Sequence, residues 1–375
     1  MIIAVNTRLL IPGKIEGIGR FALETLRIIT QNHPEHRFVF IFDRPYSDEF
    51  IFSSNIVPEV AFPPARHPFL WYAFFESGVP RILKKYKPAL FLSPDGWLTL
   101  HTKTRSLPVI HDLNFFHYPD FIPYTVRQYY NYFFPRFIRK ADRIVTVSEY
   151  TKADIISKFN YDPARIDVVY NGASGFKPVD SDERKQTGLC YAAGCPFFLS
   201  VGLIHPRKNI SGLIRAYGLF RQSNPGEVKL VIAGARKWWT ADMQEAYDSC
   251  GFRDDIIFTG RLKDEELIKL IPAALGLIYV SWFEGFGIPV LEAMYSETPV
   301  ICSSTTSLPE VGGDAVLYAD PASPASIANA MNSLYKDKDL RDNLIKKSII
   351  RRELFTWQRT ADRLWKSIEK SCESL

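Results

Sequence analysis

Cysteine is scarce in this chain, and long apolar runs are missing from it. The 375 residues include five cysteines, an odd number whose spacings do not match those of a metal site. Reduced thiols are therefore expected, which is typical of a cytoplasmic protein. No apolar run is long enough to span a bilayer, and the first residues, Met1 to Arg8, become polar too early for a signal peptide. These absences predict a cytoplasmic protein without a membrane-spanning segment.

A strong charge of either sign is also missing. The net charge is +5, and the hydrophobic content of 46% and charged content of 23% are typical of a soluble globular protein. The mild positive excess suits a phosphorylated substrate or an anionic membrane surface. It is too diffuse to indicate nucleic-acid binding, and the sequence contains no nucleic-acid-binding motif.

Strands alternate with helices through both halves of the sequence, and no internal repeat interrupts the pattern. This alternation predicts α/β architecture with parallel sheets that carry helices on both faces. The length suits two domains, so we expect two doubly wound, Rossmann-like domains with the ligand in the cleft between them. The polar stretch 180–194 is expected to be the linker, which gives domains 1–185 and 186–355 and a final helix in 356–375.

One stretch combines a strand, a glycine loop and a helix start. The apolar run 277–280 predicts a buried strand, Glu284–Gly287 a loop, and Pro289 the first turn of a helix. Backbone N–H groups around Gly287 and Ile288 and the positive helix end would then point at one spot, which suits phosphate or sugar oxygens. Side chains of a helix lean toward its N-terminus, so the carboxylates of Glu284 and Glu292 can face the same loop.

Two carboxylates beside an anion site suit a ligand that offers both hydroxyls and phosphate, as a nucleotide sugar does. The string Phe283 to Ala293 resembles the signature of the retaining glycosyltransferases of family 4, the group 1 glycosyl transferases of GT-B fold. The plain structural alternative is that Glu284 caps the helix and Glu292 is solvated. The resemblance implies that Glu292 binds the ribose, that Glu284 is catalytic, and that the last helix, 357–371, crosses back to the first domain.

Two cations follow the first strand of the second half. Arg207 and Lys208 lie between a strand end and a helix that starts at Ile210, a position that suits a diphosphate. In the resembled family an Arg and a Lys hold the diphosphate here. Lys208 matches the Lys, but Leu203 stands where the family usually has the Arg, and Arg207 is the candidate replacement. The alternative is a solvated pair.

His111 lies at the end of a predicted strand, 106–110, where ligands bind in parallel sheets. Its imidazole can donate to a sugar hydroxyl or accept a proton near neutral pH. The segment also resembles the catalytic-cleft His segment of the family, so His111 is a catalytic candidate. The common alternative for a lone His is core packing, and Asp112 is expected to serve a turn.

A glycine-rich loop precedes the first helix. Gly17 and Gly19 with Ala22 mimic a dinucleotide fingerprint, but a long loop separates them from the preceding strand, which argues against a nicotinamide site. In the resembled family, a loop here approaches the donor phosphates and the acceptor. Gly17 and Gly19 are therefore diphosphate-binding candidates, with a plain helix-entry turn as the alternative.

Three further segments have candidate contacts. The resemblance places Arg261 and Leu262, after a strand that ends at Gly260, against the nucleotide base. The stretch 69–86 is aromatic and then basic. We favour a helix that faces the core over an acceptor or membrane-contact surface; in membrane contact, Lys84, Lys85 and Lys87 would meet lipid charge. For the hydroxyls of 303–307, donor binding and turn formation are equally open.

Together these features predict a hexosyltransferase that uses a nucleoside diphosphate sugar, and the resemblance implies retention at the anomeric carbon and no need for a metal or other cofactor. No Asp-x-Asp pair occurs within the motifs described above. The sequence most resembles bacterial polysaccharide mannosyltransferases, which implies GDP-mannose as the first candidate donor, with UDP-glucose or UDP-N-acetylglucosamine as alternatives. Expected partners are a glycan or lipid-linked glycan acceptor and, at the periphery, the inner membrane. A catalytically silent nucleotide-sugar-binding module is the other class considered.

Overall fold

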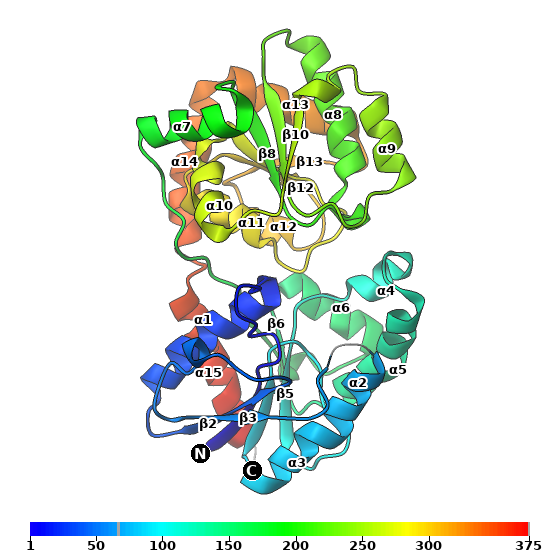
Figure 1. Cartoon of the computed structure of the whole chain (residues 1–375), viewed down its shortest axis with the longest axis vertical. Helices are drawn as coiled ribbons and strands as arrows, with labels where there is room; N and C mark the ends of the chain where they lie inside the picture. Colours follow the sequence, from blue (N-terminus) through cyan, green and yellow to red (C-terminus); the bar gives the residue numbers. More distant parts are fainter. Residues whose placement is uncertain (66–67, 374–375) are drawn as a thin grey trace. The chain divides into compact units, whose positions relative to one another are not determined.

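The computed structural model describes residues 1–65 and 68–373, and the chain divides into two compact units. Unit 1 contains Met1–Gly172 and Trp357–Leu375, and unit 2 contains Ala173–Thr356. Each unit carries one parallel sheet with helices packed around it (Figure 1). The expected α/β class with two Rossmann-like domains is confirmed.

The sheet of unit 1 has seven strands among the described residues, in the order β3-β2-β1-β4-β5-β6-β7. Their bounds are β1 (Ile2–Asn6), β2 (Arg37–Phe42), β3 (Ile56–Val60), β4 (Leu90–Ser93), β5 (Arg105–Ile110), β6 (Ile144–Thr146) and β7 (Ile166–Val168). Every pair is parallel, with Ile3 opposite Phe38 on one side and Leu90 on the other. All carboxyl strand ends therefore lie at one edge of the sheet.

Helices cover the sheet of unit 1 on both faces, and they come from both ends of the chain. They are α1 (Gly17–Asn32), α2 (Pro68–Ala73), α3 (Val79–Tyr86), α4 (Asn114–His117), α5 (Tyr124–Lys140), α6 (Glu149–Phe159) and α15 (Trp357–Glu373). The α15 helix packs against α1 within unit 1 (Figure 1). The last two residues of the predicted range 356–375 lie outside the described part of the chain.

The sheet of unit 2 has six described strands in the order β10-β9-β8-β11-β12-β13, again all parallel. They are β8 (Phe197–Val201), β9 (Lys229–Ala233), β10 (Ile256–Gly260), β11 (Gly276–Tyr279), β12 (Val300–Ser303) and β13 (Leu317–Ala319). The helices are α7 (Ser181–Ala192), α8 (Ile210–Ser223), α9 (Ala241–Asp248), α10 (Asp264–Ala273), α11 (Ile288–Tyr295), α12 (Leu308–Gly312), α13 (Pro324–Lys336) and α14 (Lys338–Arg352).

The predicted linker 180–194 is wrong, because this stretch forms helix α7 of unit 2. The side chain of Asp180 caps the helix by accepting from the N–H groups of Asp182 and Glu183, at 3.0 and 2.8 Å. Most residues of α7 are exposed, so the helix lacks the apolar stripe by which a sequence usually reveals one. The units divide at Gly172/Ala173 instead, before α7, and not at 185/186.

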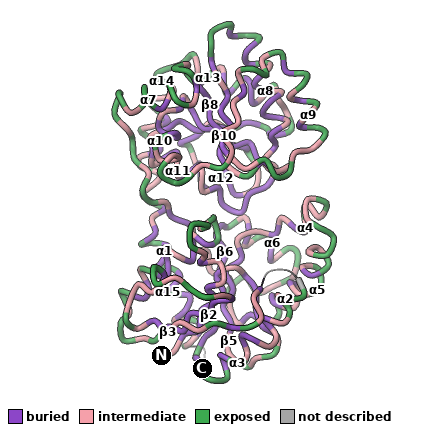
Figure 2. Tube along the Cα trace, viewed as in Figure 1, coloured by how far each residue is buried: buried purple, intermediate pink, exposed green. Residues whose placement is uncertain are grey.

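Buried residues gather along the strands in the interior of each unit (Figure 2). The aromatic stretch 69–86 is helical and faces the core with Phe74 and Phe75, whereas Phe69 and Tyr72 are exposed. The core-facing interpretation accounts for the buried rings, and membrane contact by this stretch stays a prediction. None of the described helices combines the length and apolar character needed to cross a bilayer.

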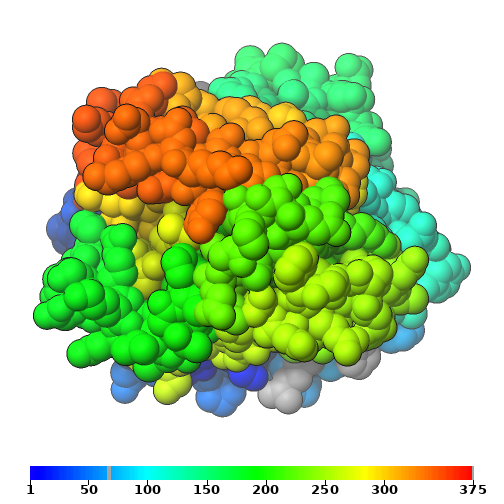
Figure 3. All heavy atoms as spheres, turned by 90° about the horizontal axis from the view of Figure 1, so that it is seen from above, coloured from blue at the N-terminus to red at the C-terminus, as the bar shows by residue number. Residues whose placement is uncertain are grey.

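A cavity of about 700 Å³ opens at the amino-terminal edge of the unit 2 sheet. It is lined by α7, α14 and the segments that lead into β8, β11 and β12. Figure 3 shows this hollow between α7 in green and the orange helix α14. Ligands of parallel α/β sheets bind at the opposite, carboxyl edge. The predicted site residues of unit 2 also lie at that edge.

Candidate functional site

The strand order of unit 2 reverses between β8 and β11. From β8 the chain adds β9 and β10 on one side, and it then returns to add β11, β12 and β13 on the other. Such a reversal leaves a crevice at the carboxyl ends of the two central strands. The segments that follow β8 and β11 contain the predicted cations, Arg207 and Lys208, and the predicted carboxylate, Glu284.

The turn that presents the two cations is held by its neighbours. It is a short 3₁₀ segment, Pro206–Lys208, in which His205 Nδ1 accepts from the N–H of Arg207 at 3.2 Å. Asn209 then adopts a left-handed conformation, with φ of 55°. Its side-chain amide donates to the carbonyls of Val280 at 3.1 Å and Pro321 at 2.8 Å. The turn after β8 is thereby attached to the segment after β11.

Glu284 lies between the two cations. Lys208 Nζ is 2.7 Å from one carboxylate oxygen, and an Arg207 guanidinium nitrogen is 2.9 Å from the other. Burial by itself raises the pKa of Glu284, but Arg207 and Lys208 outweigh it and lower the pKa to about 2. The side chain is only 9% exposed. Glu284 is therefore a buried, ionised carboxylate rather than a helix cap, and the cations are not a solvated pair.

Tyr279 completes this cluster, and sequence reasoning missed it. Its hydroxyl lies 2.5 Å from Lys208 Nζ, which also sits 4.5 Å from the ring centroid. Burial raises the pKa of Tyr279 and the neighbouring Glu284 carboxylate adds to this effect, so the phenol stays protonated. Tyr279 belongs to an apolar run, a pattern that predicts a core residue. The feature that could have indicated a site residue is its hydroxyl at the last position of a strand.

The loop after Glu284 requires its glycine. Gly287 has φ of 106°, and a Cβ there would lie 2.5 Å from a Leu308 methyl carbon. Pro289 falls in the first turn of α11, as predicted. Ser307 Oγ donates to the carbonyls of Glu284 at 2.9 Å and Phe286 at 3.1 Å, so this hydroxyl serves the loop. Gly287 and Ile288 thus form the start of α11, beside the carboxylate.

Glu292 lies half-buried on α11, near the same cluster. Its carboxylate, like that of Glu284, raises the pKa of the Tyr279 phenol through its charge. The structure therefore brings together Glu284, Glu292, Arg207 and Lys208 in unit 2. Their individual roles in binding stay predictions.

The predicted base contacts lie farther along the sheet. Arg261 and Leu262 follow β10, the edge strand, which β9 separates from β8. Leu203, which stands where the family usually has an arginine, is 41% exposed after β8. Arg207 reaches the Glu284 carboxylate together with Lys208, so it can act as a second cation there.

Unit 1 has a corresponding reversal between β1 and β4, and a polar network occupies it. The Asn6 amide donates to Asp95 at 2.8 Å, and the Arg8 guanidinium pairs with the same carboxylate at 2.5 Å. Arg8 also lies over the ring of Trp97, 5.2 Å from its centroid. No sequence motif singles out these residues. The available signal was the Pro-Asp-Gly turn that directly follows a predicted strand.

His111 follows β5 at this edge of unit 1. One ring nitrogen, Nε2, lies 2.8 Å from the Pro94 carbonyl, which can only accept, so Nε2 carries a proton. Burial lowers the pKa of His111, although the Pro94 carbonyl and the charge of Asp112 oppose this. The neutral ring therefore keeps a lone pair on Nδ1. As predicted, Asp112 serves a turn by accepting from the N–H of Asn114 at 3.0 Å.

The two glycines of the first loop differ in their surroundings. Gly17 begins α1, and a Cβ there would meet nothing within 4 Å. At Gly19 a Cβ would lie 3.0 Å from the Leu9 carbonyl oxygen, so packing alone favours glycine. Phe21 of the same helix packs edge-on against the His111 ring, with centroids 5.2 Å apart. The start of α1 and His111 thus lie together in unit 1.

Comparison with known proteins finds two families, one in each half of the chain. Residues 15–174 match Glycosyltransferase Family 4, and residues 191–351 match Glycosyl transferases group 1. The chain is 31% identical to O-antigen chain mannosyltransferase B of Escherichia coli over 74% of this chain and 73% of that protein. It is 26% identical to O-antigen chain mannosyltransferase RfbU of Salmonella typhimurium over 75% of this chain and 74% of that protein.

Solved structures share the fold at low sequence identity. HepE of Anabaena, solved in complex with UDP and glucose, aligns with a TM-score of 0.75 at 14% identity, covering 99% of this chain and all of that one.

Proposed function

Because the chain belongs to the group 1 glycosyl transferases of glycosyltransferase family 4, we propose that it transfers a hexose from a nucleoside diphosphate sugar to a glycan hydroxyl. The proposal includes retention at the anomeric carbon and chemistry that needs no metal. One observation carries it: a buried carboxylate, two cations and the start of a helix meet at the strand reversal of unit 2.

The main chemical task is to stabilise the departing diphosphate. Breaking the glycosidic bond leaves negative charge on the diphosphate and positive charge on the sugar ring. In this proposal, Arg207 and Lys208 bind the phosphates, and the N–H groups of Gly287 and Ile288 donate to them at the positive end of α11. Gly17 and Gly19 would let the start of α1 approach the donor phosphates from unit 1.

In this mechanism Glu284 has one role before the donor binds and another afterwards. Without donor, its carboxylate pairs with both Arg207 and Lys208, which leaves one net positive charge, and it holds both side chains at one place. When the diphosphate arrives, it competes for the same cations, and Glu284 can turn toward sugar hydroxyls and the developing positive charge. Glu292 would hold the ribose hydroxyls. Tyr279, which donates to neither phosphate nor sugar in this scheme, keeps the Lys208 ammonium in position.

His111 would act on the transferred sugar or the acceptor. Because Nε2–H is held by the Pro94 carbonyl, the available atom is Nδ1, which can accept a hydrogen bond from a hydroxyl. Arg261 and Leu262 would contact the base of the nucleotide.

Mannose from GDP-mannose is the first candidate donor substrate. It is supported by two relatives that are named O-antigen chain mannosyltransferases, one of them 31% identical. The acceptor would be a glycan or lipid-linked glycan of a bacterial surface polysaccharide. The same proposal places the protein in the cytoplasm, in peripheral contact with the inner membrane. Such contact would account for exposed aromatic side chains such as Phe69.

A panel of GDP, UDP, ADP and TDP sugars tests the donor by thermal shift, since a ligand at 100 times its Kd adds about 2.7 kcal/mol of stability. Release of free nucleoside diphosphate in the presence of acceptor then tests turnover. Lys208→Ala should lower kcat by roughly 10²–10³, as for other electrostatic groups that stabilise transition-state charge.

Lys229→Ala is the matched control, because Lys229 begins β9 at the opposite edge of the sheet and pairs with Asp255. Unchanged turnover in Lys208→Ala would refute the assigned site. Donor binding without any release of nucleoside diphosphate would identify a catalytically silent binding module. A thermal shift with UDP sugars alone would identify a UDP sugar, and not GDP-mannose, as the donor.

A further inference from the structure

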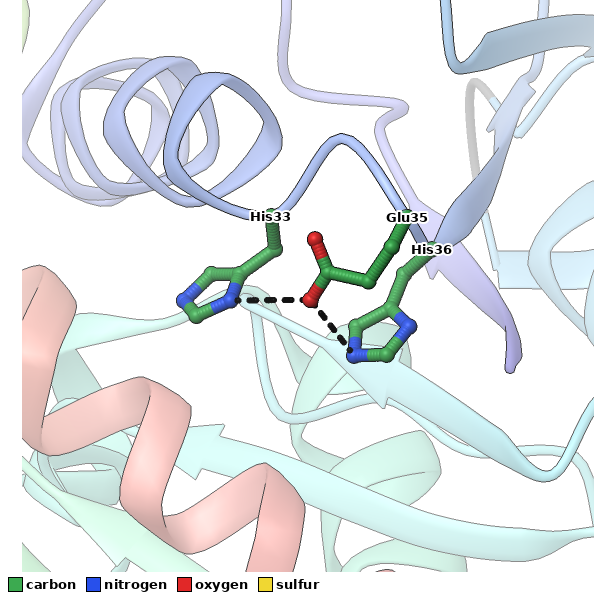
Figure 4. Close-up of side chains that lie close together, drawn as sticks. All are labelled: His33, Glu35 and His36. Carbon is green, nitrogen blue, oxygen red and sulfur yellow. Dashed lines mark ion pairs between the residues drawn. The ribbon is translucent and has the colours of Figure 1, made fainter.

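Two imidazoles and a carboxylate converge at the junction between α1 and β2 in unit 1. His33, Glu35 and His36 each offer one ligand atom, and these three atoms lie within 4.8 Å of one another. This is the one such group found among residues 1–65 and 68–373. Figure 4 shows the carboxylate of Glu35 between the two rings, with one oxygen directed at a nitrogen of each.

The two separations between Glu35 and the imidazole nitrogens are close to those of ligands around zinc. Glu35 Oε1 lies 3.6 Å from His33 Nδ1 and 3.3 Å from His36 Nε2. Zinc binds nitrogen and carboxylate oxygen at about 2.0–2.1 Å in a tetrahedron, whose ligand atoms are then about 3.3 Å apart. Both measured separations fall close to this value without any movement of the backbone.

The local structure orients these side chains. The Asn55 amide donates to the carbonyls of Thr30 and His33, at 3.0 Å each, and so fixes the end of α1. The Trp365 ring from α15 stacks on His33 with a centroid distance of 3.6 Å and on His36 at 5.1 Å. This stacking restricts the orientation of both imidazole rings.

We propose that His33, Glu35 and His36 bind a divalent zinc ion through two nitrogens and one oxygen, with water as the fourth ligand. His36 Nδ1 lies 3.2 Å from the Met1 nitrogen, so Nε2, the ring nitrogen nearer Glu35, is the atom that would bind the ion. Glu35 is 59% exposed, which gives the ion a path from solvent. The ion fastens the end of α1 to the start of β2.

This zinc site is structural and separate from the proposed transfer chemistry. The strands of unit 1 are all parallel, so the junction before β2 lies at their amino-terminal edge. Gly17 and His111 lie at the carboxyl edge. Loss of the zinc site should therefore leave hexose transfer unchanged, and the proposal can fail while the proposed function stands.

Calorimetric titration of the metal-free full chain with ZnCl₂ tests the proposal, and one equivalent should bind. His33→Ala and His36→Ala should each weaken binding more than ~10-fold, since even changes to the groups that support a metal ligand cost 10–100-fold. The matched control is His117→Ala. That imidazole also pairs with a carboxylate, Asp154 at 2.7 Å, but belongs to no such group of three.

A second readout uses Trp365. Co²⁺, which accepts the same ligands and quenches nearby indoles, should reduce the tryptophan fluorescence of the wild type. Trp365→Phe should still bind zinc but lose this quenching, whereas His36→Ala should lose both. Absence of zinc binding at a tenfold excess of metal would overturn the proposal. So would binding that persists unchanged in His33→Ala and His36→Ala.

Discussion

At the scale of single residues, Glu284 decides the electrostatics of the candidate site. A buried carboxylate alone would resist ionisation, but two cations within 2.9 Å keep it charged. Removing one member of such a cluster leaves a buried charge unpaired, which is costly. The three side chains therefore form a unit that is pre-organised before any donor binds.

This ionisation links Glu284 to acid stability. Its pKa in the folded chain is about 2, below the ordinary value of 4.5. The stabilisation it contributes is therefore fully present above pH 4.5 and is lost as the pH falls toward 2. Between pH 5 and pH 3 the wild type should lose roughly 2 kcal/mol of unfolding free energy that a Glu284→Gln variant does not lose. Urea unfolding at both pH values measures the difference.

Glu265→Gln, at an exposed position of α10, is the matched control and should show the acid sensitivity of the wild type. If Glu284→Gln and wild type lose equal stability between pH 5 and pH 3, the carboxylate is not held ionised by Arg207 and Lys208.

At the scale of elements, the sequence predicted most strands and the loop around Gly287, because apolar runs and a Gly-x-Pro signal act locally. It failed for α7, whose polar surface resembles a linker. It also failed for Tyr279 and for the Asn6–Arg8–Asp95 network. These side chains acquire their roles only when distant strands become neighbours, as β1 and β4 do, and no local pattern encodes that adjacency.

The two glycine loops allow a direct comparison. Gly287→Ala should destabilise the chain by more than about 1 kcal/mol, because φ of 106° disfavours a side chain and Leu308 lies 2.5 Å from the new Cβ. Gly17→Ala should leave stability nearly unchanged, since its Cβ would enter open space. If the loop approaches the donor phosphates, Gly17→Ala should nevertheless raise the KM for donor.

Thermal unfolding of both variants measures the effect of each substitution on packing, and donor-dependent kinetics measure its effect on donor binding. A Gly17→Ala variant with wild-type kinetics would show that this position is a plain helix entry. A Gly287→Ala variant of undiminished stability would show that the loop can shift away from Leu308.

At the scale of the whole molecule, unit 1 is built from both ends of the chain. Helix α15 is tied to it by hydrogen bonds: Thr360 Oγ1 donates to the Tyr170 carbonyl at 2.8 Å, and Arg105 donates to the Ser371 carbonyl at 2.7 Å. Leu364 and Ile368 are fully buried in the unit. The chain therefore leaves unit 1, forms unit 2 and returns, as the resemblance implied for the last helix.

This path predicts that unit 1 cannot complete its core before the last residues are made. Leu364→Ala should lower the stability of unit 1 by about 2–5 kcal/mol, as for other buried leucines cut to alanine. The exposed neighbour Lys366→Ala should have little effect. Urea unfolding monitored by amide hydrogen exchange resolves the two units, and the loss should appear in strands of unit 1 such as β4. Equal loss of protection in β8 and β11 of unit 2 would mean that the two units unfold as one, whereas no loss in either would mean that α15 contributes little to the core.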